Sequence, residues 1–290
     1  RRPDGSVDVS RVDAEGYPRI DYSGYQPQIT TENDGKIRTG GWHGHVDVKL
    51  LHELVREVGA KAVVIVNGGT GRPRDAAEWV RWSRSMGYQV EYWEVGNELD
   101  GSWEAGHVKR DGKVLTAAEY SARYAEFVAA MKAVDPSIRI GPAAVNFGPG
   151  SFGEAVLRDH ADLVDFFPVH TYPVVGSDPV EVAFEKLATL GTQVEEVRAT
   201  MRRVAPARAA TIPITYTEWN GGTHQGAGDL TSALWSCLWI GELFRHGIES
   251  ANEWDALSQG DGGYNWITGS VKAWRRSQYW AFWLWSKRMG

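Results

Sequence analysis

The sequence has a single cysteine, Cys237, among its 290 residues, so no disulfide bond can form within the chain. Apolar neighbours surround Cys237, which favours an inert buried thiol over a nucleophile. Basic residues number 31 against 37 acidic ones, and this formal net charge of -6 argues against a nucleic-acid partner. No apolar run approaches the roughly 20 residues that span a bilayer, so we expect no membrane partner.

Methionine is also scarce, at 4 residues, whereas tryptophan is abundant, at 14. An indole ring packs well but carries an N–H group that needs a hydrogen-bond partner, so a core under no other demand can be filled with fewer of them. One interpretation is an aromatic-rich core. The other is a set of flat apolar platforms on which sugar rings stack, and composition alone leaves both open.

From residue 46 onward, short runs of β-branched residues alternate with longer amphipathic segments. Helical spacing of apolar residues, stop glycines and capping motifs predict the helices, and continuous apolar runs predict buried strands. The predicted helices cover residues 46–58, 73–86, 116–134, a short segment from 151, 178–204, 230–244 and 271–286. The predicted strands cover residues 62–66, 90–95, 138–145, 163–169, 212–217 and 248–254.

Continuous apolar strands separated by helices predict an α/β protein whose parallel sheet is covered on both faces. Polar residues gather at or just beyond the C-terminal ends of the predicted strands. In a closed barrel these ends converge on one mouth, whereas an open sheet spreads them along an edge. We therefore predict a (β/α)8 TIM barrel, in which residues 46–290 form a catalytic domain that supplies strands 3 to 8.

Residues 1–45 are rich in Asp, Gly, Pro and Tyr, and their candidate strands, 6–12 and 17–22, resemble polar edge pieces more than barrel strands. The first two barrel strands are therefore atypical or missing. We expect residues 1–45 to form an irregular segment or loop over the barrel mouth. The sequence begins without Met or a signal-peptide apolar region, and we expect it to be cut from a larger protein.

Two glutamates stand at the ends of predicted strands. Glu98 follows the strand over 90–95, with Asn97 beside it, and Glu218 directly follows the strand over 212–217. An acid there is costly to ionise unless it has a partner, and each glutamate by itself could cap a helix or pair with an arginine. Two such acids facing one cavity have pKa values that are driven apart, as a proton donor and a nucleophile require. Retaining glycoside hydrolysis uses such a pair, about 5 to 5.5 Å apart.

The motifs around both glutamates resemble those of the clan A glycoside hydrolases, in which the acid/base is the Glu of an Asn-Glu pair after strand 4 and the nucleophile is a Glu after strand 7. Within the clan the sequence is most similar to the family 51 and family 39 type, which comprises α-L-arabinofuranosidases and β-xylosidases. The resemblance covers about residue 46 to the C-terminus. The matching segments are residues 92–98 (YWEVGNE), 216–219 (YTEW), 67–71 (NGGTG) with 76–80 (AAEWV), 131–136 (MKAVDP) and 165–172 (DFFPVHTY).

This resemblance implies that Glu98 is the general acid/base and Glu218 the nucleophile. Asn97 would hold the 2-hydroxyl of the sugar at the cleavage point, through a hydrogen bond that tightens as the ring becomes oxocarbenium-like. The family residues on strands 1 and 2, including an arginine that supports the nucleophile, have no visible counterpart here. The β-sandwich that usually follows the barrel in this family also has no counterpart here, because the sequence ends at Gly290.

Further substrate-binding candidates follow other strands. His170 and Tyr172 match the family's His-x-Tyr after strand 6, where the Tyr hydroxyl keeps the nucleophile ionised and oriented. Trp254, after strand 8, would be a stacking floor. Asn67 and Trp219 are also candidates, although Asn67 could equally cap the next helix.

The resemblance predicts a retaining glycoside hydrolase that cleaves plant-type polysaccharide or oligosaccharide by double displacement, most similar to an α-L-arabinofuranosidase or β-xylosidase. It requires no metal and no organic cofactor, and its partner is a carbohydrate. We expect a secreted or extracellular protein, and the oligomeric state is open.

Three alternatives remain. One is an endo-acting β-glycanase on the same barrel. Another is a metal-dependent hydrolase that uses His43, His45, His170 and Asp255 as ligands. The third is a non-catalytic carbohydrate-binding protein, in which aromatic platforms bind sugar and the acids are incidental.

Overall fold

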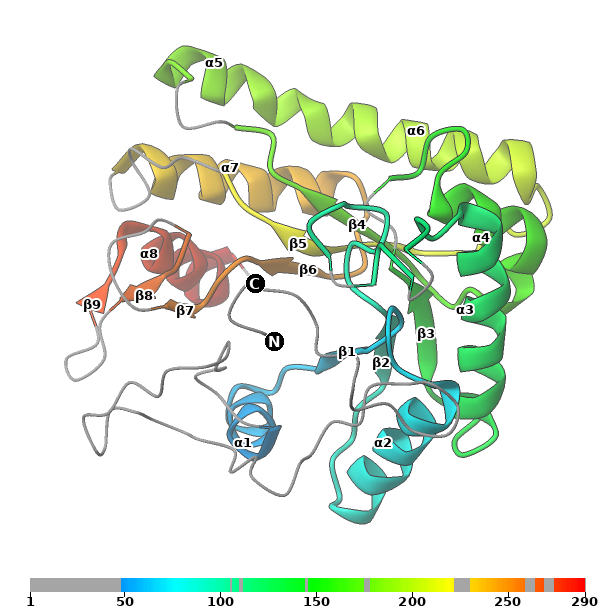
Figure 1. Ribbon diagram of the computed structural model, residues 1–290. Coiled ribbons are helices and arrows are strands. Elements are labelled where there is room, and N and C mark those ends of the chain that lie inside the picture. The colour runs from blue at the N-terminus through cyan, green and yellow to red at the C-terminus, as the bar shows by residue number, and fades with distance from the viewer. Residues whose placement is uncertain are drawn as a thin grey trace. The chain divides into compact units, whose positions relative to one another are not determined.

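The computed structural model describes residues 48–104, 106–109, 112–143, 146–174, 178–221, 230–258, 264–268 and 274–289. The chain divides into two compact units, one of residues 1–115 with 123–138 and the other of residues 116–122 with 139–290. Figure 1 traces their elements. The expected loop over residues 1–45 lies outside the described residues.

In the first unit, helices and strands alternate in the predicted order: α1 (Val48–Val58), β1 (Val63–Val66), α2 (Pro73–Ser85) and β2 (Tyr92–Val95). The two strands are parallel, with Val63 opposite Tyr92 and Val66 opposite Val95. Parallel neighbours need a crossover connection, which α2 supplies. The sequence prediction of these four elements is confirmed.

Helix α2 ends at the predicted glycine. Gly87 has a φ of +73°, a left-handed conformation that only glycine adopts without strain from a Cβ. Its N–H donates to the Arg84 carbonyl at 3.0 Å, and the Tyr88 N–H donates to the Ser83 carbonyl at 2.9 Å. These bonds satisfy carbonyls that the end of a helix leaves without intrahelical partners.

Helix α3 (Ala117–Lys132) begins at the predicted capping box. The Thr116 N–H donates to Glu119 Oε2 at 2.9 Å, and the Glu119 N–H donates to Thr116 Oγ1 at 3.3 Å. Two N–H groups at the start of the helix are thereby satisfied reciprocally.

The second unit continues the alternation of strands and helices. Its main elements are β3 (Arg139–Pro142), α4 (Phe152–His160), β4 (Phe167–Thr171), α5 (Val180–Glu185), α6 (Thr189–Val204), β5 (Ile214–Trp219), α7 (Leu230–Arg245), β6 (Ala251–Glu253) and α8 (Ser277–Leu284). Strands β4, β5 and β6 form a parallel sheet in that order. The predicted parallel pairing is therefore confirmed for β4, β5 and β6.

Two predicted boundaries are wrong in a way that matters for function. The predicted strand over 163–169 is shifted, because Ala161–Leu163 form a turn of 3-10 helix and β4 starts only at Phe167. Consequently His170 lies within β4 instead of beyond it. Likewise β5 runs on to Trp219, so Glu218 lies within the strand instead of after it.

The C-terminal helix was predicted over 271–286, but α8 begins only at Ser277. A small sheet precedes it, made of β7 (Leu257–Ser258), β8 (Ile267–Thr268) and β9 (Trp274–Arg275). Strands of two residues carry no periodicity, so the apolar spacing after residue 271 predicts a helix where the structure has short strands. The predicted long helix over 178–204 is likewise divided into α5 and α6 by the 3-10 turn Lys186–Ala188.

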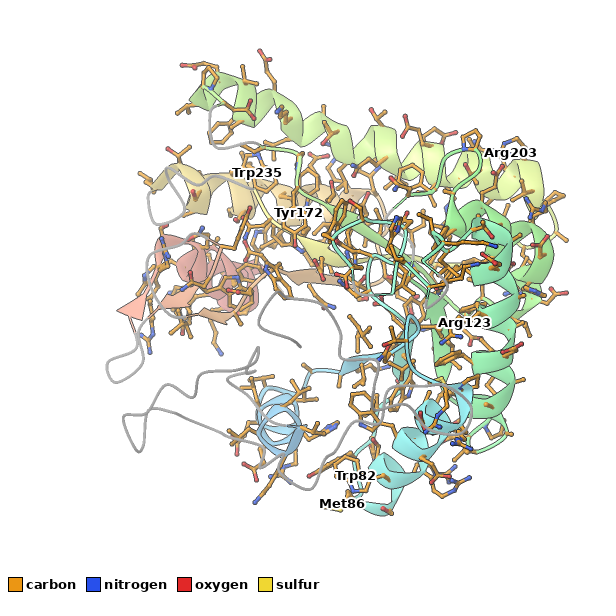
Figure 2. The ribbon with its side chains drawn as sticks, viewed as in Figure 1. Trp82, Met86, Arg123, Tyr172, Arg203 and Trp235 are labelled. Carbon is orange, nitrogen blue, oxygen red and sulfur yellow. The ribbon has the colours of Figure 1, made fainter. Side chains whose placement is uncertain are left out.

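Tryptophans form much of the core of the second unit. The rings of Trp235 and Trp239 on α7 stack with centroids 4.8 Å apart, and Trp219 on β5 packs on both. Phe282 from α8 stacks on Trp219 from another side, at 6.0 Å. Figure 2 labels Trp235 within this cluster. For these three tryptophans the core interpretation is confirmed.

Tyr120 offers a test of the packing in the second unit. Its side chain is completely buried, its ring stacks on Phe152 at 4.9 Å, and its hydroxyl accepts the Ala143 N–H at 2.6 Å. We expect Tyr120→Phe to lower the free energy of unfolding by about 1–3 kcal/mol, because a buried N–H group loses its acceptor. Urea unfolding measures this. Tyr88→Phe is the matched control, because phenylalanine retains the ring that stacks on His52, and an equal loss in both variants would contradict the assignment.

Candidate active site

Strand β5 carries one residue more than either of its neighbours. Against β4, Tyr216 pairs with Val169 and Glu218 pairs with His170, so Thr217 is an extra residue. Against β6, the register also shifts between Tyr216 and Trp219. This is a β-bulge, a feature that bends a strand and redirects the side chains that follow it.

The bulge turns Glu218 away from the helices. Tyr216 Oη donates to Gln193 Oε1 on α6 at 3.3 Å, and Trp219 packs on α7. In a regular strand Glu218 would share a face with Tyr216, because side chains alternate with period two. The extra residue instead places Thr217 and Glu218 together beside His170.

Two side chains from the end of β4 and the residue after it contact the Glu218 carboxyl group. Tyr172 Oη donates to Glu218 Oε2 at 2.9 Å, and His170 Nδ1 lies 3.6 Å from the same oxygen (Tyr172 is labelled in Figure 2). The other ring nitrogen of His170, Nε2, is 3.1 Å from Thr217 Oγ1. The Glu218 side chain retains 14% of its exposure and is thus accessible to a ligand. The contact expected between Tyr172 and Glu218 is present in the structure.

Trp219 was expected to bind substrate, and the structure contradicts this. It is 1% exposed, because the bulge leaves its ring on the helix-covered face among Trp235, Trp239 and Phe282. A side chain without exposed surface cannot stack on a sugar. Trp254, directly after β6, is 43% exposed, so its ring is available as the expected stacking floor.

A buried carboxyl group that no sequence motif indicates lies at the end of β6. Glu253, the last residue of β6, is 8% exposed, and its Oε1 accepts Ser236 Oγ at 3.2 Å. Burial raises the pKa of Glu253 well above its ordinary value of 4.5, and this outweighs the opposing effect of the nearby Trp266 and Ser236 donors. The carboxyl group of Glu253 therefore retains its proton to higher pH than a solvent-exposed glutamate does. Its position within the predicted strand over 248–254 is the signal that the sequence offers.

In the first unit, Glu98 stands in a tight turn after β2. Its φ is +42°, a left-handed conformation that non-glycine residues adopt rarely, and its carbonyl accepts the Gly101 N–H at 2.7 Å. Trp103 Nε1 donates to Glu98 Oε2 at 2.6 Å. Strain in the backbone is typical of functional positions, and here it accompanies a half-buried acid.

Asn97 is oriented by the same turn. Its Nδ2 donates to Glu104 Oε1 at 3.1 Å, while its Oδ1 is buried and has no hydrogen-bond partner among the residues that the structure describes. An unsatisfied acceptor is a place where a hydroxyl donor would be favourable, as the expected role toward a sugar 2-hydroxyl requires.

Asn67 closes a local turn. Its Oδ1 accepts the Thr70 N–H at 2.9 Å, and its Nδ2 donates to Thr70 Oγ1 at 3.0 Å. These bonds use the side chain in the manner typical of asparagine in turns. The expected alternative, in which Asn67 caps the next helix, is wrong, because the N-cap of α2 is Arg72. The Asn67 side chain is exposed, and its contact with substrate stays a prediction.

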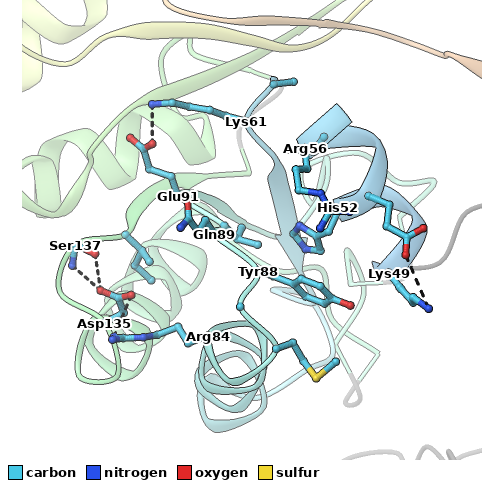
Figure 3. A pocket seen from close by; sticks show the side chains of 17 residues that line it. Lys49, His52, Arg56, Lys61, Arg84, Tyr88, Gln89, Glu91, Asp135 and Ser137 are labelled. Atoms are coloured by element: carbon cyan, nitrogen blue, oxygen red, sulfur yellow. Dashed lines mark hydrogen bonds and ion pairs between the residues drawn. The ribbon is translucent and has the colours of Figure 1, made fainter. Parts of the chain in front are cut away.

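A cavity of about 880 Å³ in the first unit lies at the opposite end of the strands (Figure 3). Its lining includes Lys61, which precedes β1, and Gln89 and Glu91, which precede β2. Lys61 Nζ and Glu91 Oε2 form an ion pair at 2.6 Å. Because Asn67 and Glu98 follow the C-terminal ends of these strands, this cavity is separate from the candidate site residues of the unit.

The metal-dependent alternative rests partly on residues that the structure does not describe, since His43 and His45 lie outside the described residues. His170 has Thr217 beside one ring nitrogen and Glu218 beside the other. These neighbours orient the ring toward the carboxyl group.

The chain is similar to known α-L-arabinofuranosidases, although no family model matches it. It is 32% identical over 167 residues to the intracellular exo-α-(1→5)-L-arabinofuranosidase 1 of Bacillus subtilis. The match covers 54% of this chain and 32% of that protein. It is 29% identical over 207 residues to the intracellular exo-α-(1→5)-L-arabinofuranosidase of Halalkalibacterium halodurans. This match covers 63% of this chain and 40% of that protein.

A solved structure shares the fold of this chain. The family 51 α-L-arabinofuranosidase of Thermotoga petrophila superposes with a TM-score of 0.69 and 24% identity, over 83% of this chain and 52% of that one. The resemblance to the family 51 type of glycoside hydrolase is thereby confirmed. The chain spans about a third to two-fifths of the length of these two curated relatives.

The location of the protein was expected to be extracellular. The two relatives above are named intracellular enzymes, and a secreted or extracellular location of this chain stays a prediction. Within the described part of the chain, no helix combines the length and apolar character that crossing a bilayer requires.

Glu253 gives a prediction for the pH dependence of stability. Above its ordinary pKa of 4.5 the unfolded chain releases the Glu253 proton while the native state retains it, so stability falls as pH rises toward the native pKa. Glu253→Gln removes this ionisation. The variant should match the wild type near pH 4 and become progressively more stable than it toward neutral pH, as thermal unfolding across pH measures. The matched control is Glu196→Gln on the exposed face of α6, and a constant difference at all pH values would contradict the assignment.

Proposed function

We propose that this chain carries the catalytic machinery of a retaining α-L-arabinofuranosidase that acts on plant-type polysaccharide or oligosaccharide. The observation that carries the proposal is the surroundings of Glu218, whose carboxyl group is held by Tyr172 and His170 on a bulged strand end. A hydrogen bond from a phenol hydroxyl favours the ionised carboxylate and fixes its orientation, as a nucleophile requires. The names of the similar proteins support arabinofuranose as the sugar.

The proposed reaction has two displacements. In the first, a Glu218 oxygen attacks the anomeric carbon, the glycosidic bond breaks, and Glu98 gives its proton to the departing oxygen. In the second, Glu98 takes a proton from water as the water oxygen attacks the same carbon, and the Glu218 carboxylate leaves. The configuration of the sugar is retained because each displacement inverts it.

The neighbouring residues have supporting roles in this proposal. The unsatisfied Oδ1 of Asn97 accepts the 2-hydroxyl of the sugar, and the exposed ring of Trp254 supplies the stacking floor. In this proposal residues 46–290 form the catalytic domain and contribute strands 3 to 8 of a (β/α)8 barrel, and the retaining mechanism requires two carboxyl groups about 5 to 5.5 Å apart. The exposed Asn67 stays a candidate for substrate binding, whereas the buried Trp219 has no role toward the substrate.

The nucleophile assignment predicts the behaviour of Glu218→Ala. This variant should lose more than about 10⁴-fold in kcat on 4-nitrophenyl α-L-arabinofuranoside, because no covalent intermediate can form. Sodium azide should restore turnover and give an arabinosyl azide of inverted configuration, which NMR identifies. Glu195→Ala, an exposed glutamate on α6, is the control and should retain wild-type kcat. Wild-type turnover in Glu218→Ala without azide would refute the assignment.

The acid/base assignment predicts a dependence on the leaving group. Glu98→Ala should lower kcat/KM about 10²- to 10⁴-fold on arabino-oligosaccharides, whose leaving alkoxide needs a proton. The loss of the first step should be much smaller for 4-nitrophenyl arabinofuranoside, since nitrophenolate leaves without protonation. Pre-steady-state release of nitrophenolate separates this step from the second. An equal loss of that step on both substrates would mean that Glu98 does not act as the acid.

A substrate panel distinguishes the remaining candidates. Nitrophenyl arabinofuranoside, xyloside and glucoside, with arabinan, xylan and β-glucan, separate arabinofuranosidase activity from xylosidase and endo-glycanase activities. We expect hydrolysis of the arabinofuranoside, unchanged by EDTA. Binding of oligosaccharide without any release of sugar would instead support the carbohydrate-binding alternative.

A further inference from the structure

Asn220, the residue after β5, occupies the point where three strands end. Its side chain is 3% exposed. Its backbone N–H donates to the carbonyl of Thr171, the last residue of β4, at 3.3 Å. Its Nδ2 donates to the carbonyl of Trp254, directly after β6, at 2.7 Å. One residue thus ties β4, β5 and the residue after β6 together.

The same Nδ2 also donates to the Tyr264 carbonyl at 3.1 Å. Tyr264 lies far along the chain from Trp254, beyond the β7 segment, so this bond fixes a second segment against the end of β5. The ring of Tyr264 meets the ring of Tyr172 edge to face, with centroids 5.8 Å apart. Tyr172 in turn donates to Glu218. A continuous series of contacts therefore leads from Asn220 to the candidate nucleophile.

We propose that Asn220 is a positioning residue for the reaction: by holding the Trp254 and Tyr264 carbonyls it sets the Tyr172 hydroxyl on Glu218. This inference rests on the proposed function, because it concerns the same nucleophile. An amide is suited to this place, since its two N–H hydrogens match two carbonyl acceptors and it adds no charge beside Glu253, whose Oε1 lies 3.5 Å from Nδ2.

The consequence is specific to one step of catalysis. When Asn220 loses its N–H donors, the Tyr264 segment is released and the Tyr172 ring loses its lateral support. A nucleophile displaced by about 1 Å can lose about 100-fold in rate. The effect should appear in kcat, through the orientation of Glu218.

A double-mutant cycle tests the series of contacts. Asn220→Ala should lower kcat about 10- to 100-fold in the wild-type background and much less in the Tyr172→Phe background, because the second variant has already removed the hydroxyl that Asn220 sets. Equal losses in both backgrounds would overturn the inference, since Asn220 would then act independently of Tyr172. Asn252→Ala, an exposed asparagine within β6, is the matched control and should retain wild-type kcat.

A second variant distinguishes loss of the positioning role from misfolding. Asn220→Asp has nearly the same size, but its ionised carboxylate repels the two carbonyls, whereas its protonated form can donate to one of them. The ratio of its kcat to that of the wild type should therefore rise as pH falls. A ratio that does not change with pH, in a variant that melts as the wild type does, contradicts the positioning role.

Hydrogen exchange separates this inference from the proposed function. The backbone N–H groups of Trp266 and Ile267 donate to the carbonyls of Asp255 and Ala256, at 3.1 and 3.0 Å. In Asn220→Ala these amides should exchange faster while those of α6 remain unchanged, whatever the substrate. If the wild-type chain hydrolyses no glycoside, the proposed function fails while exchange still reports whether Asn220 holds the segment. If the chain is active but exchange and kcat are unaltered in the variant, only the inference fails.

Discussion

The extra residue in β5 determines on which face of the sheet the Glu218 carboxyl group lies. It is extra against β4 and against β6, so it belongs to β5 and not to one pairing. Regular alternation would place Glu218 under α6 and α7, where an acid has no access to substrate. The bulge places the carboxyl group on the same face as His170 and Tyr172, whereas Trp219 lies on the helix-covered face.

The aromatic core behind the strand makes this arrangement rigid. Trp219 follows Glu218 directly and is held by Trp235, Trp239 and Phe282, so the backbone on one side of Glu218 cannot shift without disrupting four large rings. The next residue, Asn220, bonds to the end of β4 and to the residue after β6. The abundance of tryptophan, which composition left unexplained, thus serves the core and, through the exposed Trp254, the surface as well.

Each candidate catalytic acid receives a hydrogen bond from a neutral donor within its own unit. Trp103 donates its indole N–H to Glu98, and Tyr172 donates its hydroxyl to Glu218. Neither donor carries a charge, so each orients a carboxyl group without forming an ion pair that would have to be broken during a reaction. The strained backbone of Glu98 and the bulge before Glu218 are two different local devices that aim an acid away from its strand.

The sequence by itself determined the order of helices and strands, the parallel pairing of the strands that end at the candidate residues, and the relationship to family 51, because these follow from periodicity, caps and contiguous motifs. Tertiary structure decided which way individual side chains point. The bulge at Thr217, the burial of Trp219 and the contacts of Asn220 and Glu253 depend on register between strands that are distant in the sequence, and a single extra residue reverses the face of everything after it. No local pattern records that register, so the sequence could name Glu218 and Trp219 together but could not distinguish the exposed acid from the buried ring.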